Sequence, residues 1–169
     1  MSKLPTMIND VNAFIKDTEF AGLANTATLP KIVTKTVDMV LAGVAGDVER
    51  DLGKLEKLES DVTISDYSPL VLDLVGSRAS REETLTLRGA LDVGDRISTL
   101  VVKMQGYWKG VEFNEFKPET EATTKFSIAV EVYTLELDGK EIIHIDKMNN
   151  IFRINGKDRN KEIREALAQ

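Results

Sequence analysis

The residues of this chain that could carry out chemistry are few and lie far apart. His144 is the only histidine, and the chain contains no cysteine. Nucleophilic catalysis or metal binding through histidine would depend on this one residue, which lies between two isoleucines and has no companion motif. A single histidine in such a setting is more often a structural or surface residue than a base. His144 therefore does not indicate an active site.

Carboxylates are the next candidates, and they gather in two places. One cluster is Asp47, Glu49 and Asp51, and the other is Glu82 and Glu83. Paired carboxylates can act as general acid and base. Neither cluster lies beside an aromatic-rich stretch that could line a substrate cleft, so solvated surface is the favoured interpretation.

Two further segments could bind ligands. The glycines of residues 42–46 suggest a phosphate-binding loop, but the lysine and serine of such a loop are missing. Tyr107 and Trp108 lie close to Lys103 and Lys109, and aromatic side chains beside cations can stack on bases. In an acidic protein, core filling or an interface anchor is the favoured role for these rings. The sequence predicts no enzyme, no metal site and no cofactor.

Length and composition favour a single domain over residues 1–169. The formal net charge is −6, which argues against a surface that grips phosphate backbones but allows a smooth wall past which nucleic acid moves. The N-terminus has no signal-peptide pattern. The longest apolar run, residues 39–46, is too short for a membrane anchor. We therefore expect a protein made and kept in the cytoplasm.

A long β-hairpin over residues 123–158 is the strongest structural signal. Alternating apolar residues predict one half-buried strand: Phe126, Ile128, Val130 and Val132. The alternation changes phase near Thr134, which indicates a bulge or a twist. Asp138-Gly139 is a common two-residue hairpin turn. The second strand of the hairpin then carries Ile142, Ile143 and Ile145.

Shorter signals predict the other elements. A short hairpin is expected from residues 11–15 and 19–22, and a strand from residues 26–37 with Pro30 at its start or on an edge. Further strands are expected at residues 62–64, 84–89 and 97–105. Ser68-Pro69 opens a helix that Gly76 ends, with Leu70, Leu72, Leu74 and Val75 as its apolar content. The last twelve residues predict a short, charged, exposed helix.

Residues 47–61 are ambiguous. Val48, Leu52, Leu55 and Leu58 lie close to helical spacing, so this pattern alone predicts an amphipathic helix, although Gly53 weakens it. In total we expect about seven strands, one internal helix and one terminal helix. Strands at hairpin distances imply an antiparallel α+β domain that is mainly β.

Residues 39–46 also carry the clearest surface signal. They form an apolar stretch where a loop is expected, and soluble loops are rarely so apolar. Exposed apolar loops usually belong to interfaces, and long strands with free edges can be completed by neighbouring subunits. These features favour a self-assembling β protein.

Short motifs in a fixed order then suggest a family. They are residues 12–17 (NAFIKD) with 20–22 (FAG), residues 28–31 (TLPK) with Lys35, residues 51–53 (DLG), residues 133–140 (YTLELDGK), and residues 154–156 (ING) with Asp158. In their order and spacing the chain resembles the tail tube proteins of contractile phage tails, including the related R-type pyocin tubes. The resemblance covers nearly the whole chain. It departs at residues 39–46, which are more apolar and contain fewer glycines than the family's loop.

The resemblance implies a mainly antiparallel α+β fold: a β-sandwich or open barrel with one packed internal helix, completed by its neighbours into a multi-subunit barrel ring. Hexameric rings would stack into the hollow inner tube of a contractile phage tail or a similar injection particle, the conduit for DNA or effectors. The implied partners are other copies of the chain, the sheath protein, and tape measure, baseplate and tail terminator proteins. The implied location is the virion, assembled in the bacterial host cytoplasm. Relatives also form residues 47–61 as loop and strand, which replaces the helix.

Six residues are the candidate contacts between subunits: Met39, Val40, Leu41, Val44, Leu52 and Leu55. The alternative function is a monomeric β-barrel that binds a small ligand. That alternative requires a barrel closed within one chain and an enclosed apolar pocket.

Overall fold

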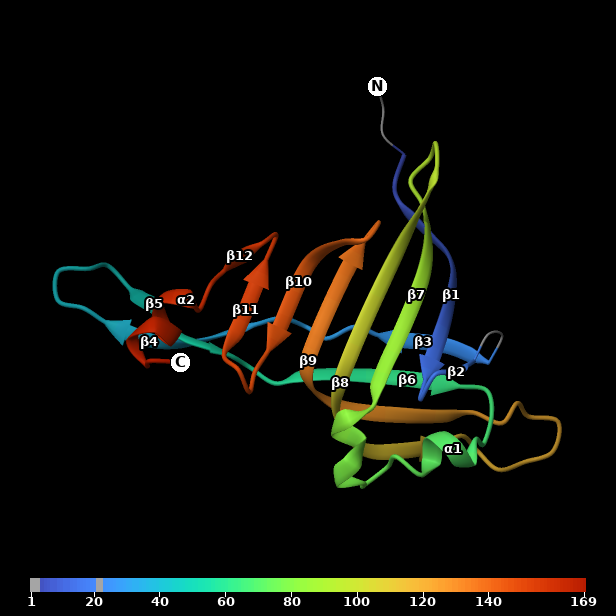
Figure 1. Ribbon diagram of the computed structural model, residues 1–169. Helices are drawn as coiled ribbons and strands as arrows, with labels where there is room; N and C mark the ends of the chain where they lie inside the picture. The colour runs from blue at the N-terminus through green and yellow to red at the C-terminus, as the bar shows by residue number, and fades with distance from the viewer. Residues whose placement is uncertain (1–3, 21–22) are drawn as a thin grey trace.

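The hairpin predicted over residues 123–158 lies at the centre of the fold. The computed structural model describes residues 4–20 and 23–169 (Figure 1). β9 (Thr124–Leu137) and β10 (Lys140–Asp146) are joined by Asp138 and Gly139, whose φ angles are +50° and +80°. Two positive φ angles define the turn whose twist matches that of paired strands. The predicted turn and both strands are confirmed.

The main sheet grows outward from this hairpin and is antiparallel throughout. Its strand order is β12-β11-β10-β9-β8-β7-β1-β2. The other bounds are β1 (Met7–Ile15), β2 (Thr18–Glu19), β7 (Thr84–Asp92), β8 (Ile97–Phe113), β11 (Ile151–Ile154) and β12 (Lys157–Asp158). The sheet is open, because its two ends do not pair with each other within residues 4–20 and 23–169. The mainly antiparallel α+β class is confirmed.

A second layer forms because β8 and β9 bend out of the main sheet. Residues 132–137 of β9 pair with β10, whereas residues 124–130 pair with β6 (Leu58–Ile64), which in turn pairs with β3 (Ala24–Thr28). In Figure 1, β3 and β6 cross the strands of the main sheet steeply. The register of β8 on β9 shifts between Gln105 and Gly106, where Glu131 is left over as a bulge.

This bulge corrects the predicted phase change. The sequence suggested a change near Thr134, but the extra residue is Glu131. Val132 therefore pairs with Gln105 on the opposite face from Phe126, rather than beside it in the core. The predicted strand 97–105 also continues through the bend to Phe113, because β9 supplies partners along its whole length.

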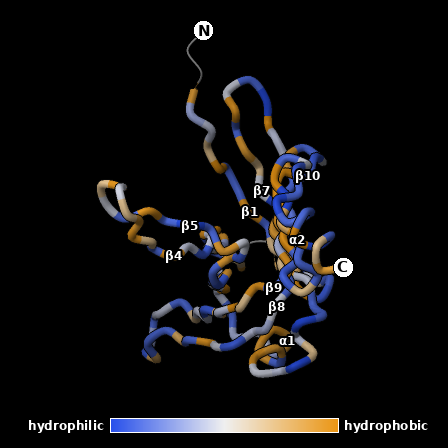
Figure 2. The backbone as a smooth tube through the Cα atoms, turned by 90° about the vertical axis from the view of Figure 1, so that its left-hand side faces the viewer, coloured by the Kyte–Doolittle hydropathy of each residue, from blue (hydrophilic) through white to orange (hydrophobic). Residues whose placement is uncertain are grey.

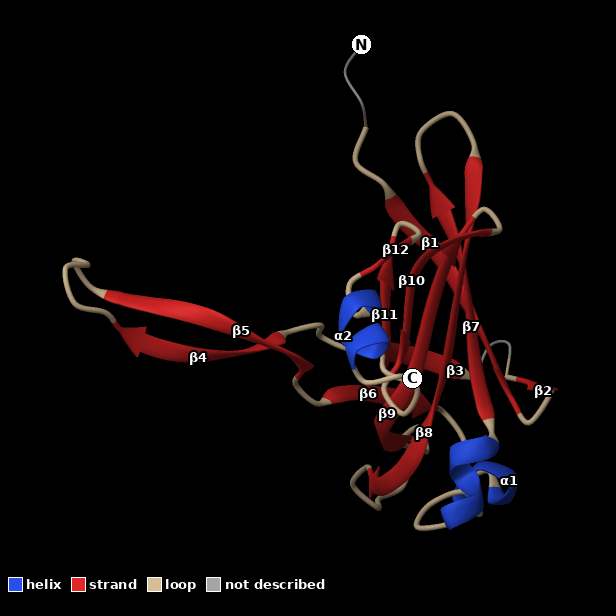
Figure 3. Cartoon of the chain, turned by 60° about the vertical axis from the view of Figure 1, so that its left-hand side comes forward, coloured by secondary structure: helices blue, strands red, loops and turns tan. Residues whose placement is uncertain are grey.

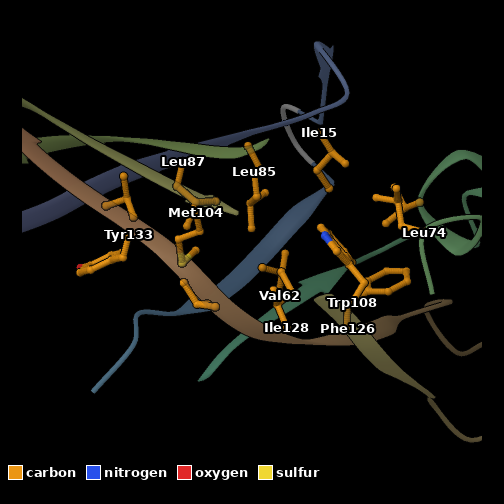
Figure 4. Close-up of a cluster of buried hydrophobic side chains, with 14 of the residues drawn as sticks. Ile15, Val62, Leu74, Leu85, Leu87, Met104, Trp108, Phe126, Ile128 and Tyr133 are labelled. Carbon is orange, nitrogen blue, oxygen red and sulfur yellow. The ribbon is translucent and has the colours of Figure 1, made fainter. Parts of the chain in front are cut away.

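The hydrophobic core lies between the two layers. Figure 4 shows side chains from both layers pointing toward one another. Trp108 is 1% exposed and meets Phe126 edge to face, with ring centroids 5.5 Å apart. Trp108 is therefore a core residue, and the sequence-based interpretation of core filling is confirmed.

The segment between β6 and β7 closes one end of this core. α1 (Pro69–Leu72) opens at Ser68-Pro69 as predicted, and Val71 is fully buried. The helix is a single turn, shorter than expected, and Gly76 follows it with a φ of +75°. A 3₁₀ helix, Arg78–Glu82, then places the buried Ser80 against Trp108.

Ser80→Ala is expected to lower the free energy of unfolding by about 1–3 kcal/mol, the usual cost of a buried donor left without a partner. The Ser80 hydroxyl accepts a hydrogen bond from the Trp108 backbone N–H at 3.2 Å and donates one to the Ser77 carbonyl at 2.7 Å. Urea unfolding followed by fluorescence of Trp108, the only tryptophan, measures the change. Ser77→Ala keeps the accepting carbonyl and should be close to neutral; equal stabilities of the two variants would contradict this account.

Two predicted elements are wrong in their extent or type. The strand predicted over residues 26–37 is two strands, β3 and β4 (Thr34–Val40), and the buried Pro30 lies between them in neither. The helical pattern of residues 47–61 belongs to β5 (Asp47–Leu55) and β6. Gly53 has a φ of +70°, which an α-helix does not accept, and β4 provides the paired strand. The loop-and-strand form implied by the resemblance is confirmed.

The described residues contain twelve strands where about seven were expected, because several have only two to five residues. The predicted hairpin near the N-terminus is confirmed, with Lys16 and Asp17 at positive φ in its turn. Its second strand, β2, is Thr18–Glu19 rather than residues 19–22: Phe20 lies in no strand, and Ala21 and Gly22 lie outside the described residues. α2 (Lys161–Ala166) is the predicted terminal helix. None of the helices described is long and apolar enough to cross a membrane.

Candidate assembly surfaces

The most prominent surface is a two-stranded arm. β4 and β5 pair with each other and with no other strand described, so residues 34–55 form a hairpin separate from the main sheet. Figures 1 and 3 show this arm projecting from the body of the molecule. An isolated two-stranded hairpin is marginally stable in water. A surface that covers the arm would therefore stabilise it.

The end of the arm, which we call the tip (residues 39–46), is apolar and exposed. Val40 is 83% exposed, and Leu41 and Val44 are each close to half exposed. Met39 is half-buried and pairs with Val48. Figure 2 shows apolar segments at this end of the arm. A cluster of exposed apolar side chains at the end of a projection is typical of an interaction surface.

Leu52 and Leu55 lie at the other end of the arm. Leu52 is 52% exposed, whereas Leu55 packs partly against the main core. A side chain on Gly53 would meet the Ile163 Cδ1 atom at 2.8 Å, so Ile163 of α2 rests directly on the base of the arm. The six predicted contact residues are thus divided between the tip and the base.

Polar contacts hold α2 against the main sheet. Arg164 forms an ion pair with Asp158 and donates a hydrogen bond to the Asn150 carbonyl at 3.0 Å. Asn160 donates to the Asn150 side-chain oxygen at 2.8 Å. The hydrogen bond from Arg164 is the main reason that the pKa of the Asp158 carboxyl lies below its usual range. Through Ile163, these contacts also set the position of the arm's base.

Arg164→Ala is expected to free α2 and to speed amide hydrogen exchange in α2 and at residues 52–55, because Ile163 then no longer rests firmly on Gly53. The pKa of Asp158 should rise toward its ordinary value. Since pairing lowers the folded-state pKa, the stabilisation is present above the unfolded-state pKa and is lost as pH falls through the folded-state value. Lys161→Ala removes only an exposed ion pair and is the control. Unchanged exchange at residues 52–55 would show that α2 does not support the arm.

The main sheet also exposes a long edge that the sequence analysis did not identify. β1 begins at Met7, four residues before the predicted strand, and β2 pairs with only its last two residues. Met7 is 61% exposed and Ile8 is 66% exposed. The apolar pair Met7-Ile8 shortly after Pro5 was the available signal. An edge of this kind is a template for pairing with another chain.

The residues considered for chemistry do not come together. The Thr134 hydroxyl lies 2.9 Å from His144 Nδ1, and both are on the main sheet. Asp47, Glu49 and Asp51 are exposed on the arm, whereas Glu82 is the last residue of the 3₁₀ helix at the end of the core and Glu83 follows it. Tyr107 packs under Arg81, whose guanidinium carbon is 5.1 Å from the ring centroid. Within the described part of the chain, no group of three or more potential ligands could hold a metal ion.

Within the residues it describes, the structure does not provide the closed barrel that the ligand-binding alternative requires. An apolar cavity between the two layers, lined by residues such as Val11, Val62 and Leu87, has a volume of about 110 Å³. Ligand pockets usually measure about 300–1,000 Å³. The sheet of the described residues is open, so this chain does not enclose a barrel.

An open antiparallel sheet, an exposed edge and an apolar arm tip together define the class of protein: a structural β subunit suited to association with its neighbours. The family is shown by sequence. The profile of the phage tail tube protein FII family matches residues 5–167, and the chain belongs to this family.

Relatives of known role agree with this assignment. The tail tube protein of Escherichia phage P2 is 27% identical over 173 residues, covering 97% of this chain and 98% of that protein. The major tail tube protein of Serratia phage KSP20 is 26% identical over 156 residues, covering 91% and 90%. The chain is a structural tail tube protein of the contractile-tail type and not an enzyme. The resemblance drawn from the motifs is confirmed.

A solved structure shares the fold. The sheath/tube terminator of PVC, an extracellular contractile injection system in its extended state, superimposes with a TM-score of 0.59 at 11% identity. The match covers 79% of this chain and 97% of that one. At this identity the similarity establishes the fold alone.

Proposed function

We propose that this chain, acting as a single domain, forms hexameric rings that stack into the hollow inner tube of a contractile tail or similar injection particle. The observation that carries the proposal is an open main sheet with an exposed β1 edge in a member of the tail tube family. Closing sheets from several subunits into one barrel removes all free edges. A closed ring also explains why the main sheet of a single subunit remains open instead of closing into a barrel.

Ring closure uses the two ends of the main sheet. The β1 edge of one subunit pairs with the β11–β12 edge of the next, so each contact joins different surfaces of two identical chains. Met7 and Ile8, both exposed in the single subunit, become covered at this contact. The pairing supplies main-chain hydrogen bonds to strands that would otherwise face water.

Stacking uses the arm. The tip, with Met39, Val40, Leu41 and Val44, reaches the adjacent ring, where its apolar side chains leave water. Leu52 adds to the same surface nearer the base, while Leu55 anchors the arm on its own subunit. Stacking in one direction is open-ended and produces a filament.

The remaining partners follow from this role. The tube lies inside a sheath protein, and its further partners are tail terminator, baseplate and tape measure proteins. Its lumen then conducts DNA or effectors. The protein is a component of the virion and is assembled in the host cytoplasm.

Sedimentation velocity over a range of concentrations tests the proposal. Species at six times the monomer mass and larger multiples are expected to appear as concentration rises, because each ring closes before rings stack. A single monomeric species at all concentrations, with or without baseplate proteins to nucleate assembly, would contradict ring formation.

A further inference from the structure

The loop between β8 and β9 presents aromatic side chains to solvent. Phe116 is 95% exposed, and Phe113 at the end of β8 is 52% exposed. The residues around these rings are mostly acidic. Residues 112–121, which we call the acidic loop, contain one cation, Lys117, and four carboxylates: Glu112, Glu115, Glu119 and Glu121. Exposed rings among carboxylates suit a partner surface that combines an apolar groove with cations.

Hydrogen bonds hold the neck of the acidic loop in one shape. The Asn114 side-chain amide donates to the Glu121 carbonyl at 2.6 Å, and the Asn114 side-chain oxygen accepts from the Thr123 N–H at 3.2 Å. The Tyr67 hydroxyl donates to the same oxygen at 2.9 Å. The rings of Tyr67 and Phe113 meet edge to face, with centroids 5.6 Å apart. A loop that is already ordered loses little conformational entropy when it binds a partner.

The base of the arm carries the opposite charge. β3 leads into β4, and β5 into β6, through residues 31–35 and 54–57, and the Glu56 N–H donates to the Val33 carbonyl at 2.8 Å between these segments. We call the two segments the basic collar. They contain one carboxylate, Glu56, and four exposed cations: Lys31, Lys35, Lys54 and Lys57. Their excess of three cations equals the excess of three carboxylates on the acidic loop.

A groove opens beside the basic collar, between β5, the turn after β10 and α2. It has a volume of about 480 Å³, and we call it the base groove. Ile163 is part of its apolar lining. Met148 and Leu167, which also line it, are 80% and 59% exposed. The base groove can therefore accept an aromatic side chain and shield it from water.

The charged side chains that line the base groove are Lys54, Lys147 and Asp146. Asp146 already accepts a hydrogen bond from the Asn149 side chain at 2.7 Å. Burial, followed by the positive charge of Lys35, holds the pKa of the Lys147 ammonium below its ordinary value. A carboxylate from a partner would offset the repulsion between the two lysines.

The acidic loop and the basic collar lie at opposite ends of β6. Ile64, at the far end of β6, pairs with Thr124 directly after the acidic loop, whereas Leu58 follows the basic collar and pairs with Val130. In Figure 1 the acidic loop lies on the β1 side of the molecule, and the arm and α2 lie on the β12 side. One chain therefore does not bring its own loop and collar together. In the proposed ring, the β1 side of one subunit meets the β12 side of the next.

We infer that the acidic loop of each subunit docks on the arm base of the next subunit in the ring, with Phe116 in the base groove and the glutamates of the loop against the basic collar. This inference rests on the proposed ring and adds a second contact to the pairing of sheet edges. Copies of a chain with a net charge of −6 repel one another. A local match of opposite charges offsets this repulsion and favours the head-to-tail orientation that closes a ring.

Paired cysteines test this contact, because the chain has none of its own. The variant that combines Lys117→Cys beside Phe116 with Met148→Cys at the base groove is assembled, oxidised and run on a non-reducing denaturing gel. We expect a ladder of covalent oligomers that ends at the hexamer, because each subunit offers one loop and one groove. Either single variant should give no ladder above the dimer. Asp95→Cys with Met148→Cys is the matched control and should stay monomeric, since Asp95 is exposed in the β7–β8 turn, away from both surfaces.

Reversed charges provide a second measurement. Glu115→Lys and Lys54→Glu should each raise the concentration needed for half-assembly by about fivefold or more, because attraction becomes repulsion at every contact of the ring. The variant that carries both changes should recover most of this loss. Glu115→Lys combined with Lys109→Glu, an exposed lysine of the second layer, should not recover it. All these positions are exposed, so circular dichroism should show folded subunits throughout.

Assembled rings of the paired-cysteine variant that give no ladder would overturn the inference and leave the proposed ring intact. A ladder that continues beyond the hexamer would place the contact between rings and would also overturn it, as would losses that simply add when Glu115→Lys and Lys54→Glu are combined. Thr120→Cys, in the same loop, replaces Lys117→Cys if that variant does not assemble. Absence of rings from the unmodified chain is a separate result, which would contradict the proposed function itself.

Discussion

Gly106→Ala is expected to prevent the subunit from folding. A Cβ atom at position 106 would lie 2.1 Å from the Ala129 carbonyl oxygen and 2.8 Å from the Val130 Cα. Both are backbone atoms of β9 at the bend, so no side chain can move aside. Ordinary over-packing costs about 1–3 kcal/mol, and a backbone clash in the central strand pair exceeds it. Total stability is only about 5–15 kcal/mol for a domain.

Gly110→Ala is the matched control for this substitution. Gly110 lies on the same strand, four residues further, and a Cβ there would meet nothing within 4 Å. Its free energy of unfolding should stay within about 0.5 kcal/mol of the parent. Circular dichroism and urea unfolding of both variants provide the measurement. A folded Gly106→Ala variant with near-parent stability would show that β8 and β9 do not approach as closely as described.

Val44→Asp should leave the subunit folded but largely abolish stacking. Val44 is 48% exposed at the tip of the arm, and its described backbone contact is a turn hydrogen bond to the Leu41 carbonyl at 3.3 Å. A surface substitution of this kind changes stability by about 0.5 kcal/mol or less. In a stacked tube the carboxylate would be buried without a partner at every copy of the contact, at a cost of several kcal/mol each. Light scattering against concentration measures the loss of long assemblies.

Val44→Thr is the control, because it keeps the branched shape of valine without adding a charge. It should assemble with only a modest loss, and both variants should unfold at the same urea concentration as the parent. Tubes of normal length from Val44→Asp would remove the tip from the contact between rings. The proposal would then have to place stacking on another surface.

Local signals in the sequence were sufficient for the hairpins. The turn at Asp138-Gly139 was predicted because a two-residue turn depends on a few residues with positive φ. The hairpin after Ile15 was predicted from the two short segments that flank residues 16–18. The start of α1 at Ser68-Pro69 was also predicted from local residues, because capping residues act within one turn of the helix. These features need no information about the rest of the chain.

Features that depend on distant partners could not be predicted in the same way. The apolar spacing of residues 47–61 fits a helix, but β4 and β9 supply strand partners that no local pattern reveals. Gly106 gave no distinctive signal, because its role arises from Ala129 on another strand. The six candidate contacts were chosen as one apolar group, yet Leu55 proves to pack against the core while Val40 is 83% exposed. Only the register of all the strands shows which alternate residues share the face of the main sheet opposite the core.

Negative-stain electron microscopy of the purified chain at high concentration, with and without baseplate proteins, tests the central claim most directly. The account predicts six-fold rings in end views and hollow tubes of uniform diameter in side views, because sheet edges and arm tips are both covered only in the stacked assembly. Uniform monomers under every condition, in a protein that folds cooperatively, would contradict the claim that this chain builds a tube.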